Sequence, residues 1–273
     1  MTINCKGTLI DLTVPAVMGI LNVTPDSFFD GGKHTNDADL LRHAESMLSQ
    51  GATFIDVGAY SSKPSAAQVS ESEELSRIVP VVDLLMKNFP EALLSVDTFR
   101  SRVAQDCIEH GAAIINDISA GYLDDQMLEV VAMFQVPYIM MHMRGTPQTM
   151  QTFTNYDDII REMMFYFSER VQQARALGIN DIIADPGFGF AKTLEQNYQV
   201  LQKLELFAHL DVPLLVGFSR KSMIYKLLKS SPEKALNGTS VLNTIALQKG
   251  ANILRVHDVR EAVECIRITQ MLA

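Results

Sequence analysis

Eight short apolar runs recur along this chain, and most of them end at a polar residue. They are VMGILN, FIDVG, LLSVD, AIIND, YIMMH, IIAD, LLVGFSRK and ILRVH. A run of about 4 to 8 large apolar side chains is typical of a strand that is buried on both faces. Each run is followed by a longer stretch of helical periodicity, so the sequence predicts an α/β fold of alternating strands and helices. This pattern is typical of a (β/α)8 TIM barrel, in which chemistry takes place where the strands end.

The length of the chain fits one barrel. Its 273 residues are 47% hydrophobic, and a barrel of this kind typically needs about 250 residues. We therefore expect a single domain over 1–273, with a short strand pair before Val17 that covers the bottom of the barrel. Helices are expected at about 38–50, 71–88, 99–110, 124–134, 154–177, 194–208, 222–250 with a break at Ser230, Ser231 and Pro232, and 259–271.

Charge and composition argue against several classes of protein. The formal net charge is -9 and the Lys and Arg residues are scattered, whereas a nucleic-acid surface needs clustered cations. No apolar stretch reaches the roughly 18 residues that span a membrane, and the start lacks a secretory signal, so we expect a cytoplasmic protein. The cysteines Cys5, Cys107 and Cys265 are far apart, and we expect them to be packing residues.

The loops after the first two strands are long for this fold. They cover 24–35 and 60–70 and are rich in Gly, Pro and Ser, whereas strand-to-helix turns usually have about 2 to 6 residues. Length alone is equally consistent with tolerated surface insertions. The pair Gly31–Gly32 offers hinge freedom and the pair Phe28–Phe29 gives a polar loop an apolar surface, which favours lids over a site.

Polar side chains at three strand ends predict a ligand pocket. Alternation along a strand points Ser95 and Asp97 to the same side, which can be the barrel interior. There Asp97, Asn116 and Asp185 would converge beside Lys221 and form an acceptor-rich wall suited to a flat heterocycle with several N–H groups. Alternatively, Asp97 and Asp185 cap the following helices. Three acceptors at three strand ends, with the glycines of DPGFGF, favour the shared pocket.

A basic corner is expected beside this wall. GFSRKS places Arg220, Lys221 and Ser222 at a helix start, where free N–H groups and the helix dipole favour an anion. Arg255 and His257 lie on the same side of ILRVH and are expected to join them. The cluster indicates a site for phosphate or carboxylate.

A metal site made by the protein alone is not expected. The six histidines show no ligand spacing such as HxxxH, which argues against zinc. A Mg²⁺ ion carried in by a polyphosphate needs only one or two oxygen ligands from the protein. Asn22, at the end of the first strand, can supply one of them.

Longer motifs carry a resemblance to a known family. They are MGILNVTPDSFFDGG, SVDTFR, INDISAG, MMHMRGTP, DPGFGF, GFSRKS, NGTSVLN and LRVHDV. In this order and spacing, which spans Met18 to Val259, the chain resembles the dihydropteroate synthases of folate biosynthesis, a pterin-binding TIM-barrel family and the target of sulfonamides. SVDT-like and IND-like strand ends also occur in other pterin-binding barrels, but the first motif joined to GFSRKS and RVH is highly specific.

The resemblance implies a transferase reaction. The substrates would be 6-hydroxymethyl-7,8-dihydropterin pyrophosphate and p-aminobenzoate, and the products 7,8-dihydropteroate and pyrophosphate. In the expected mechanism, pyrophosphate leaves first and the arylamine then attacks the pterin cation, while the first two loops exclude water. The resemblance also implies Mg²⁺ as the cofactor and a homodimer through helices on the far side of the barrel.

The resemblance further implies which residues form the site. Catalytic roles fall to Asp97, Asp185, Lys221, Arg255 and His257. Pterin-binding positions are Asp97, Asn116, Met140, Asp185, Phe190, Gly217 and Lys221. Pyrophosphate-binding positions are Asn22, Lys63, Arg255 and His257, and Asn22 is also the metal ligand. Positions for p-aminobenzoate are Ser62, Lys63, Pro64, Phe190, Lys221 and Ser222.

The second loop departs from the family pattern. Tyr60 replaces an acid, Lys63 replaces an arginine and Ser65 replaces a glycine. Lys lacks the planar fork of Arg, so we predict a weaker p-aminobenzoate site and altered sulfonamide affinity. Unchanged affinities in Lys63→Arg would contradict that prediction.

Two other functions stay open at this point. A pterin-dependent methyltransferase shares the acidic wall, but it binds a methylated reduced folate and passes the methyl group to a corrinoid partner. GFSRKS together with RVH argues against it. A non-catalytic pterin-binding paralogue is the second alternative, and it would bind the pterin without releasing pyrophosphate.

Overall fold

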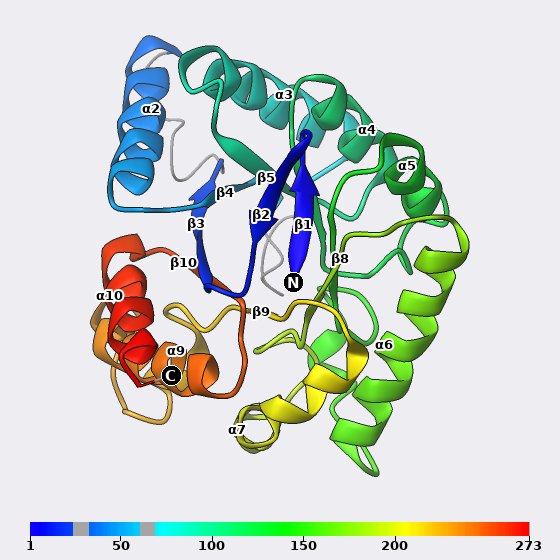
Figure 1. The fold of residues 1–273 in the computed structure, drawn as a ribbon, viewed down its shortest axis with the longest axis vertical. Helices are drawn as coiled ribbons and strands as arrows, with labels where there is room; N and C mark the ends of the chain where they lie inside the picture. The colour runs from blue at the N-terminus through cyan, green and yellow to red at the C-terminus, as the bar shows by residue number, and fades with distance from the viewer. Residues whose placement is uncertain (24–32, 61–68, 273) are drawn as a thin grey trace.

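The computed structural model describes residues 1–23, 33–60 and 69–272. Within these ranges, eight parallel strands run in the order β8-β7-β6-β5-β4-β3-β10-β9, and a parallel bridge from Ala184 to Leu214 brings the two outer strands together. Helices surround this ring (Figure 1), so the predicted TIM barrel is confirmed. The barrel strands are β3 (Ala16–Asn22), β4 (Phe54–Gly58), β5 (Leu93–Asp97), β6 (Ile114–Asp117), β7 (Tyr138–Met141), β8 (Ile182–Asp185), β9 (Leu215–Val216) and β10 (Ile253–Val256).

The helices follow the expected order with shifted ends. The first begins at Lys33 rather than at 38, and the helix expected over 194–208 divides into an α-helix and a 3-10 helix. The expected break near Pro232 is confirmed as a 3-10 turn. The α-helices are α2 (Lys33–Ser49), α3 (Glu71–Asn88), α4 (Ser101–Glu109), α5 (Met127–Phe134), α6 (Ile159–Ala176), α7 (Leu194–Gln202), α8 (Ser222–Tyr225), α9 (Leu236–Gln248) and α10 (Val259–Gln270), and the 3-10 helices are η1 (Met150–Thr152), η2 (Leu204–Leu210) and η3 (Pro232–Lys234).

Local side chains define several helix starts. The Ser70 hydroxyl accepts a hydrogen bond from the Glu73 N–H at the start of α3, whose first turn is acidic. At the start of α7, Thr193 and Gln196 form a reciprocal capping box. These contacts satisfy N–H groups that have no partner inside the helix.

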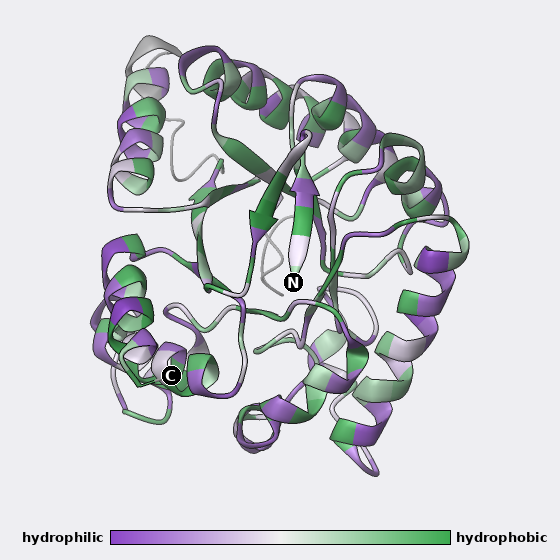
Figure 2. Ribbon diagram, in the orientation of Figure 1, coloured by the Kyte–Doolittle hydropathy of each residue, from purple (hydrophilic) through white to green (hydrophobic). Residues whose placement is uncertain are grey.

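Strand residues alternate between two apolar layers. Outward residues such as Tyr138 and Met140 pack against the helices, whereas inward residues such as Ile139 and Ile183 fill the bottom of the barrel. Figure 2 shows the same division, with hydrophobic strands and with hydrophilic residues on the outer faces of the helices. Inward positions near the carboxyl ends of the strands are polar, and they form the site described below.

A short antiparallel pair covers the bottom of the barrel. It consists of β1 (Thr2–Cys5) and β2 (Thr8–Asp11), and it lies across the ring of strands in Figure 1. Ile3 and Cys5 of this pair pack among the inward residues, which confirms the predicted cover. All three cysteines are buried and free, as expected of packing residues. In the described part of the chain, every helix is too short or too polar to cross a membrane.

Candidate active site

The carboxylate of Asp56, in β4, is a centre of hydrogen bonding in the upper barrel. Its side chain is fully buried, and it accepts hydrogen bonds from Ser95 Oγ at 2.6 Å, Asn116 Nδ2 at 3.1 Å and Arg255 Nε at 2.6 Å. Three other strands of the barrel, β5, β6 and β10, are thereby joined to one side chain of β4. Asp56 is not among the site residues predicted from the sequence. Its position two residues after the inward Phe54 is the signal that could have revealed it, because inward residues recur with a period of two.

Arg255 connects this centre to Asp97. Its Nη2 donates to Asp97 Oδ2 at 2.7 Å, so one guanidinium contacts two carboxylates. Burial raises the pKa of Asp97 to about 7, and the attraction of Arg255 opposes that shift. The expected acidic wall and the expected basic corner are therefore in direct contact rather than side by side. Among the described residues, Nη1 of Arg255 has no hydrogen-bond partner and remains available to an anion.

Asp185 and Lys221 lie at the same mouth, and each affects the ionisation of the other. Burial raises the pKa of Asp185, and the positive charges of Lys221 and Arg255 oppose this effect. Burial also lowers the pKa of Lys221 to about 8, against the attraction of Asp185. Asp185 and Arg255 thus open onto one end of the barrel, as the sequence predicted.

Lys221 is held by the turn that follows β8. Its Nζ donates to the Phe188 carbonyl at 2.6 Å and lies 5.0 Å from the centre of the Phe190 ring. Gly217 sits beside it, since a Cβ atom placed there would lie 3.8 Å from Lys221 Nζ. Lys221, Phe190 and Gly217 are therefore brought together, as the resemblance implied.

His257 and Arg220 differ from the cations expected of the basic corner. Burial, with Arg255 nearby, lowers the pKa of His257 to about 4, so its imidazole is neutral at pH 7. The His257 Nδ1 lies 2.9 Å from Ser219 Oγ. Arg220 donates to both carboxylate oxygens of Asp258, at 3.0 and 2.6 Å, which neutralises its charge locally. Lys221 and Arg255 therefore supply the positive charge at this corner.

The helix start at Ser222 is a weaker anion site than expected. The helix α8 has only four residues, whereas the sequence predicted a long helix from 222. A helix dipole grows with the number of aligned peptide groups, so one turn contributes little. Ser222 itself lies directly after Lys221 and close to the mouth.

Met140, predicted to contact the pterin, faces away from the pocket. Its side chain packs in the outer layer between strands and helices, so it does not face the barrel interior. Met141, one residue later, joins the apolar cluster beside Phe190 at the mouth. A shift of one residue along a strand reverses the face, and the inward Ile139 in the same strand could have given the correct register.

The alternative in which the two aspartates cap helices is not observed. The residue that precedes α4 is Arg100, and α7 is capped by Thr193. The Asp185 carboxylate instead accepts from the Gly187 N–H at 2.8 Å, inside its own turn. Asp97 is engaged by Arg255. Both carboxylates therefore belong to the mouth of the barrel.

Asn22 ends β3 at the same mouth, and its side chain is exposed. Among residues 1–23, 33–60 and 69–272, no three His, Cys, Asp or Glu side chains are grouped to hold a metal ion. An exposed amide oxygen at a strand end fits a Mg²⁺ ion that keeps most of its water ligands.

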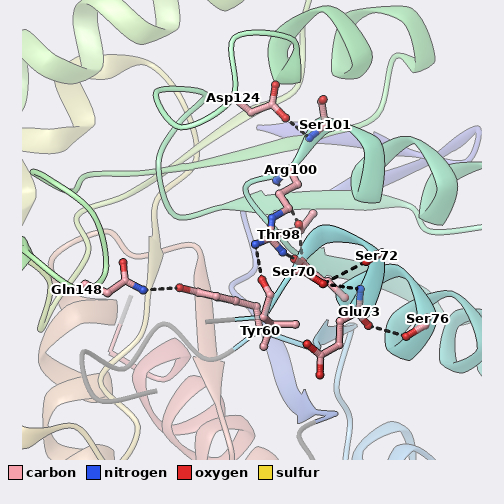
Figure 3. Close-up of polar contacts among 12 residues, drawn as sticks. Tyr60, Ser70, Ser72, Glu73, Ser76, Thr98, Arg100, Ser101, Asp124 and Gln148 are labelled. Atoms are coloured by element: carbon pink, nitrogen blue, oxygen red, sulfur yellow. Dashed lines mark hydrogen bonds and ion pairs between the residues drawn. The ribbon is translucent and has the colours of Figure 1, made fainter. Parts of the chain in front are cut away.

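Three predicted site residues, Ser62, Lys63 and Pro64, lie outside the described residues, as does the 24–32 part of the first loop. The ends of the second loop are described, and Figure 3 shows their contacts. The Tyr60 ring meets the Phe99 ring edge-on at 5.3 Å, and Gln148 Nε2 donates to the Tyr60 hydroxyl at 2.9 Å. The Val69 carbonyl accepts from Arg100 Nη2 at 2.6 Å.

A cavity of about 450 Å³ lies among these same contacts. Its lining comes from the ends of the second loop and from segments that follow β5, β6 and β7. The lining residues are Tyr60, Val69, Ser70, Phe99, Arg100, Leu123, Thr146, Pro147 and Gln148.

The chain is similar to known proteins in sequence and in fold. The pterin binding enzyme family matches residues 18–257. The chain is 46% identical to dihydropteroate synthase of Escherichia coli K12 over 272 residues, which cover 99% of this chain and 96% of that protein. A crystal structure of Yersinia pestis dihydropteroate synthase with a sulfonamide drug is 45% identical with a TM-score of 0.93, covering 100% and 99% of the two chains. Xanthomonas albilineans dihydropteroate synthase with 4-aminobenzoic acid is 38% identical with a TM-score of 0.91, covering 99% and 97%.

Proposed function

Because this chain belongs to the dihydropteroate synthase family of pterin-binding enzymes, we propose that it condenses 6-hydroxymethyl-7,8-dihydropterin pyrophosphate with p-aminobenzoate. The products are 7,8-dihydropteroate and pyrophosphate. One observation carries the proposal. The partly buried Asp97 carboxylate and the buried Asp185 carboxylate share one barrel mouth with the cations Arg255 and Lys221. A pterin with a diphosphate tail presents the complementary pattern of N–H donors and negative charge.

In the proposed complex, the pterin ring lies on the inward polar residues. Asp97, Asn116 and Asp185 accept hydrogen bonds from it, and Lys221 donates to it. The apolar faces of the ring contact Phe190 and Met141, which belong to one cluster at the mouth. Arg255 presents its Nη1 to the diphosphate, and His257 acts as a neutral imidazole beside it.

The reaction then begins with loss of pyrophosphate. The bond between the exocyclic methylene carbon and the pyrophosphate oxygen breaks, and the pterin carries the positive charge. The Asp97 and Asp185 carboxylates stabilise that cation, and fixed charges of this kind can each contribute roughly 3 to 4 kcal/mol. The p-aminobenzoate nitrogen next bonds to the methylene carbon and loses a proton to solvent.

Asn22 is the residue that we propose for Mg²⁺. Bound with the diphosphate, the ion would offset negative charge on the leaving group. The p-aminobenzoate would lie near Phe190, Lys221 and Ser222, with Ser62, Lys63 and Pro64 from the second loop. The two related structures that contain a sulfonamide drug and 4-aminobenzoic acid support this choice of ligand class.

The test is direct. Purified protein is mixed with Mg²⁺, the pterin pyrophosphate and p-aminobenzoate, and dihydropteroate is measured while each component is omitted in turn. Product that depends on both substrates is expected, and a sulfonamide should compete with p-aminobenzoate. Pterin binding without pyrophosphate release would instead identify a non-catalytic paralogue, and binding of methyltetrahydrofolate would favour a methyltransferase.

Asp185→Ala is the sharpest variant for this proposal. It should abolish turnover and weaken pterin binding, because it removes the carboxylate next to Lys221. The exposed Asp83, in α3, provides a matched control in Asp83→Ala. Turnover by Asp185→Ala equal to that of the control would remove the assignment.

We also propose a homodimer. Exposed apolar side chains on neighbouring helices support it, since Val241 of α9 is 50% exposed and Ile268 of α10 is 64% exposed. Light scattering on the purified protein should give twice the mass of 30.3 kDa. The cytoplasmic location stays a prediction from the sequence.

A further inference from the structure

Lys192 is a buried lysine that the proposed reaction does not use. It follows the DPGFGF turn, and only 4% of the residue is exposed. Its Nζ lies 3.1 Å from His142 Nδ1 and donates to the Gly187 and Phe190 carbonyls, each at 3.0 Å. A lysine ammonium has three N–H donors, so all of them are engaged in this arrangement.

His142 is suited to accept one of these hydrogen bonds. Burial, with Lys192 and Arg144 nearby, lowers the pKa of His142 well below its ordinary value, so its ring is neutral. A neutral imidazole can present Nδ1 as an acceptor. The ring is fixed by an edge-on contact with Tyr166, at 4.8 Å between centres. His142 therefore anchors Lys192 to the end of β7.

The Gly187 and Phe190 carbonyls, which Lys192 binds, flank in sequence a carbonyl that binds Lys221. Between them, the Phe188 carbonyl accepts from Lys221 Nζ at 2.6 Å. The Phe190 ring lies against the same ammonium. At the start of the turn, the Gly187 N–H donates to the Asp185 carboxylate. Lys192 thus fixes the backbone of the 187–190 segment, and the same segment contacts Asp185 and Lys221.

Burial of the Lys192 ammonium costs desolvation free energy, which its contacts must offset. Burial lowers the pKa of Lys192 to about 7, and Lys221 and Arg144 add to that shift, whereas Asp185 opposes it. Methionine would fill a similar volume without the cost of burying an ammonium. Packing alone therefore does not explain a lysine here, whereas the need to fix two carbonyls does.

We propose that Lys192 is a positioning residue for the pterin pocket, which holds the 185–190 turn so that Asp185 and Lys221 point into the barrel mouth. This inference rests on the proposed function, because the pterin pyrophosphate is the ligand whose binding it serves. Lys192 itself does not contact the substrate.

The first experiment measures the turn directly. Hydrogen exchange is compared in Lys192→Met and in the matched control Lys203→Met, whose lysine is exposed just after α7. The amides of Gly187, Gly189 and Phe190 are hydrogen-bonded in the structure. They should exchange about tenfold faster in Lys192→Met only, because two buried carbonyls lose their donor.

The second experiment measures binding of the pterin pyrophosphate without p-aminobenzoate. The Kd should rise about tenfold in Lys192→Met and stay unchanged in Lys203→Met. His142→Phe removes one acceptor, whereas His142→Asn supplies an amide oxygen in its place. His142→Phe should weaken pterin binding and His142→Asn should recover part of it, and this pair decides the matter if Lys192→Met does not fold.

The outcomes separate this inference from the proposed function. Unchanged exchange of the turn in Lys192→Met would overturn the inference. Faster exchange with an unchanged pterin Kd would overturn it too, because Lys192 would then stabilise the turn without serving the site. A wild-type protein that binds the pterin but forms no dihydropteroate would refute the synthase activity alone, and the binding data would still decide the role of Lys192.

Discussion

The Nε atom of Arg255 lies 2.6 Å from Oδ2 of Asp56, in an ion pair that joins the last strand of the barrel to the second. Asp56 is fully buried, and the Arg255 side chain is 19% exposed. In an ion pair of this kind, removal of one partner leaves the other charge without compensation in a poorly solvated place. The polar mouth is therefore organised around a carboxylate that the sequence motifs did not highlight.

Asp56→Ala should reduce the free energy of unfolding by about 3 kcal/mol, because the change leaves the partly buried Arg255 with one partner fewer. It also removes the acceptor of Ser95 and Asn116. Urea denaturation at pH 7 measures the loss. Asp83→Ala, at an exposed position of α3, should change stability by less than about 0.5 kcal/mol. Equal stability of the two variants would contradict the prediction.

Gly187→Ala should be far more damaging than Gly178→Ala. Both glycines have positive φ, at +66° and +86°, so both substitutions strain the backbone. Of the two, only Gly187 lies where the new Cβ would meet other atoms, and it would overlap the His142 carbonyl oxygen. We expect a loss of about 1 kcal/mol at Gly178 and of about 3 kcal/mol or more at Gly187. Thermal unfolding of the two variants provides the comparison, and similar losses would rule out the close contact.

Arg100→Met should destabilise the protein by about 3 kcal/mol at pH 8, because Arg100 is the ion partner of Glu74, which is 1% exposed. Burial already raises the pKa of Glu74. When the pKa of a carboxyl is higher in the folded protein than in the unfolded chain, the stability of the protein falls as pH rises between the two pKa values. Loss of Arg100 should raise the folded pKa of Glu74 further, so the loss of stability in Arg100→Met should be smaller at pH 5 than at pH 8.

Urea denaturation at both pH values tests this prediction. Arg42→Met removes an exposed pair with Asp39, whose side chains are 75% and 53% exposed, and should cost less than about 0.5 kcal/mol. A deficit in Arg100→Met that is the same at pH 5 and pH 8 would argue against the role of Glu74.

Pterin binding should weaken above pH 8. The pKa of Lys221 is lowered to about 8 by burial, so the ammonium that we propose as a donor to the pterin is mostly lost by pH 9. If only the charged form binds, the Kd for the pterin pyrophosphate should rise roughly tenfold between pH 7 and pH 9. Calorimetry at the two pH values measures the ratio. Lys203→Met should show the same rise in Kd with pH, and Lys221→Met should show none. A constant Kd in the wild type would contradict the role of Lys221 in pterin binding.

The fold was predictable from the sequence because it depends on local patterns. Apolar runs that alternate with helical periodicity predict a parallel barrel, and the carboxyl ends of such strands share one edge. For the same reason Asp97, Asn116 and Asp185 could be assigned to one mouth, and the strand pair before Val17 to the opposite end. The family motifs added the expected reaction.

What the tertiary structure decided is the pairing of charges and the exact face of each side chain. Arg255 contacts Asp56 and Asp97, Arg220 is neutralised by Asp258, and these partners lie 38 or more residues apart in the chain. Met140 faces outward because one position along a strand reverses its side. Such contacts arise only when distant strands close into a ring, since the sequence supplies each charge but the closure of the barrel sets which opposite charge it meets.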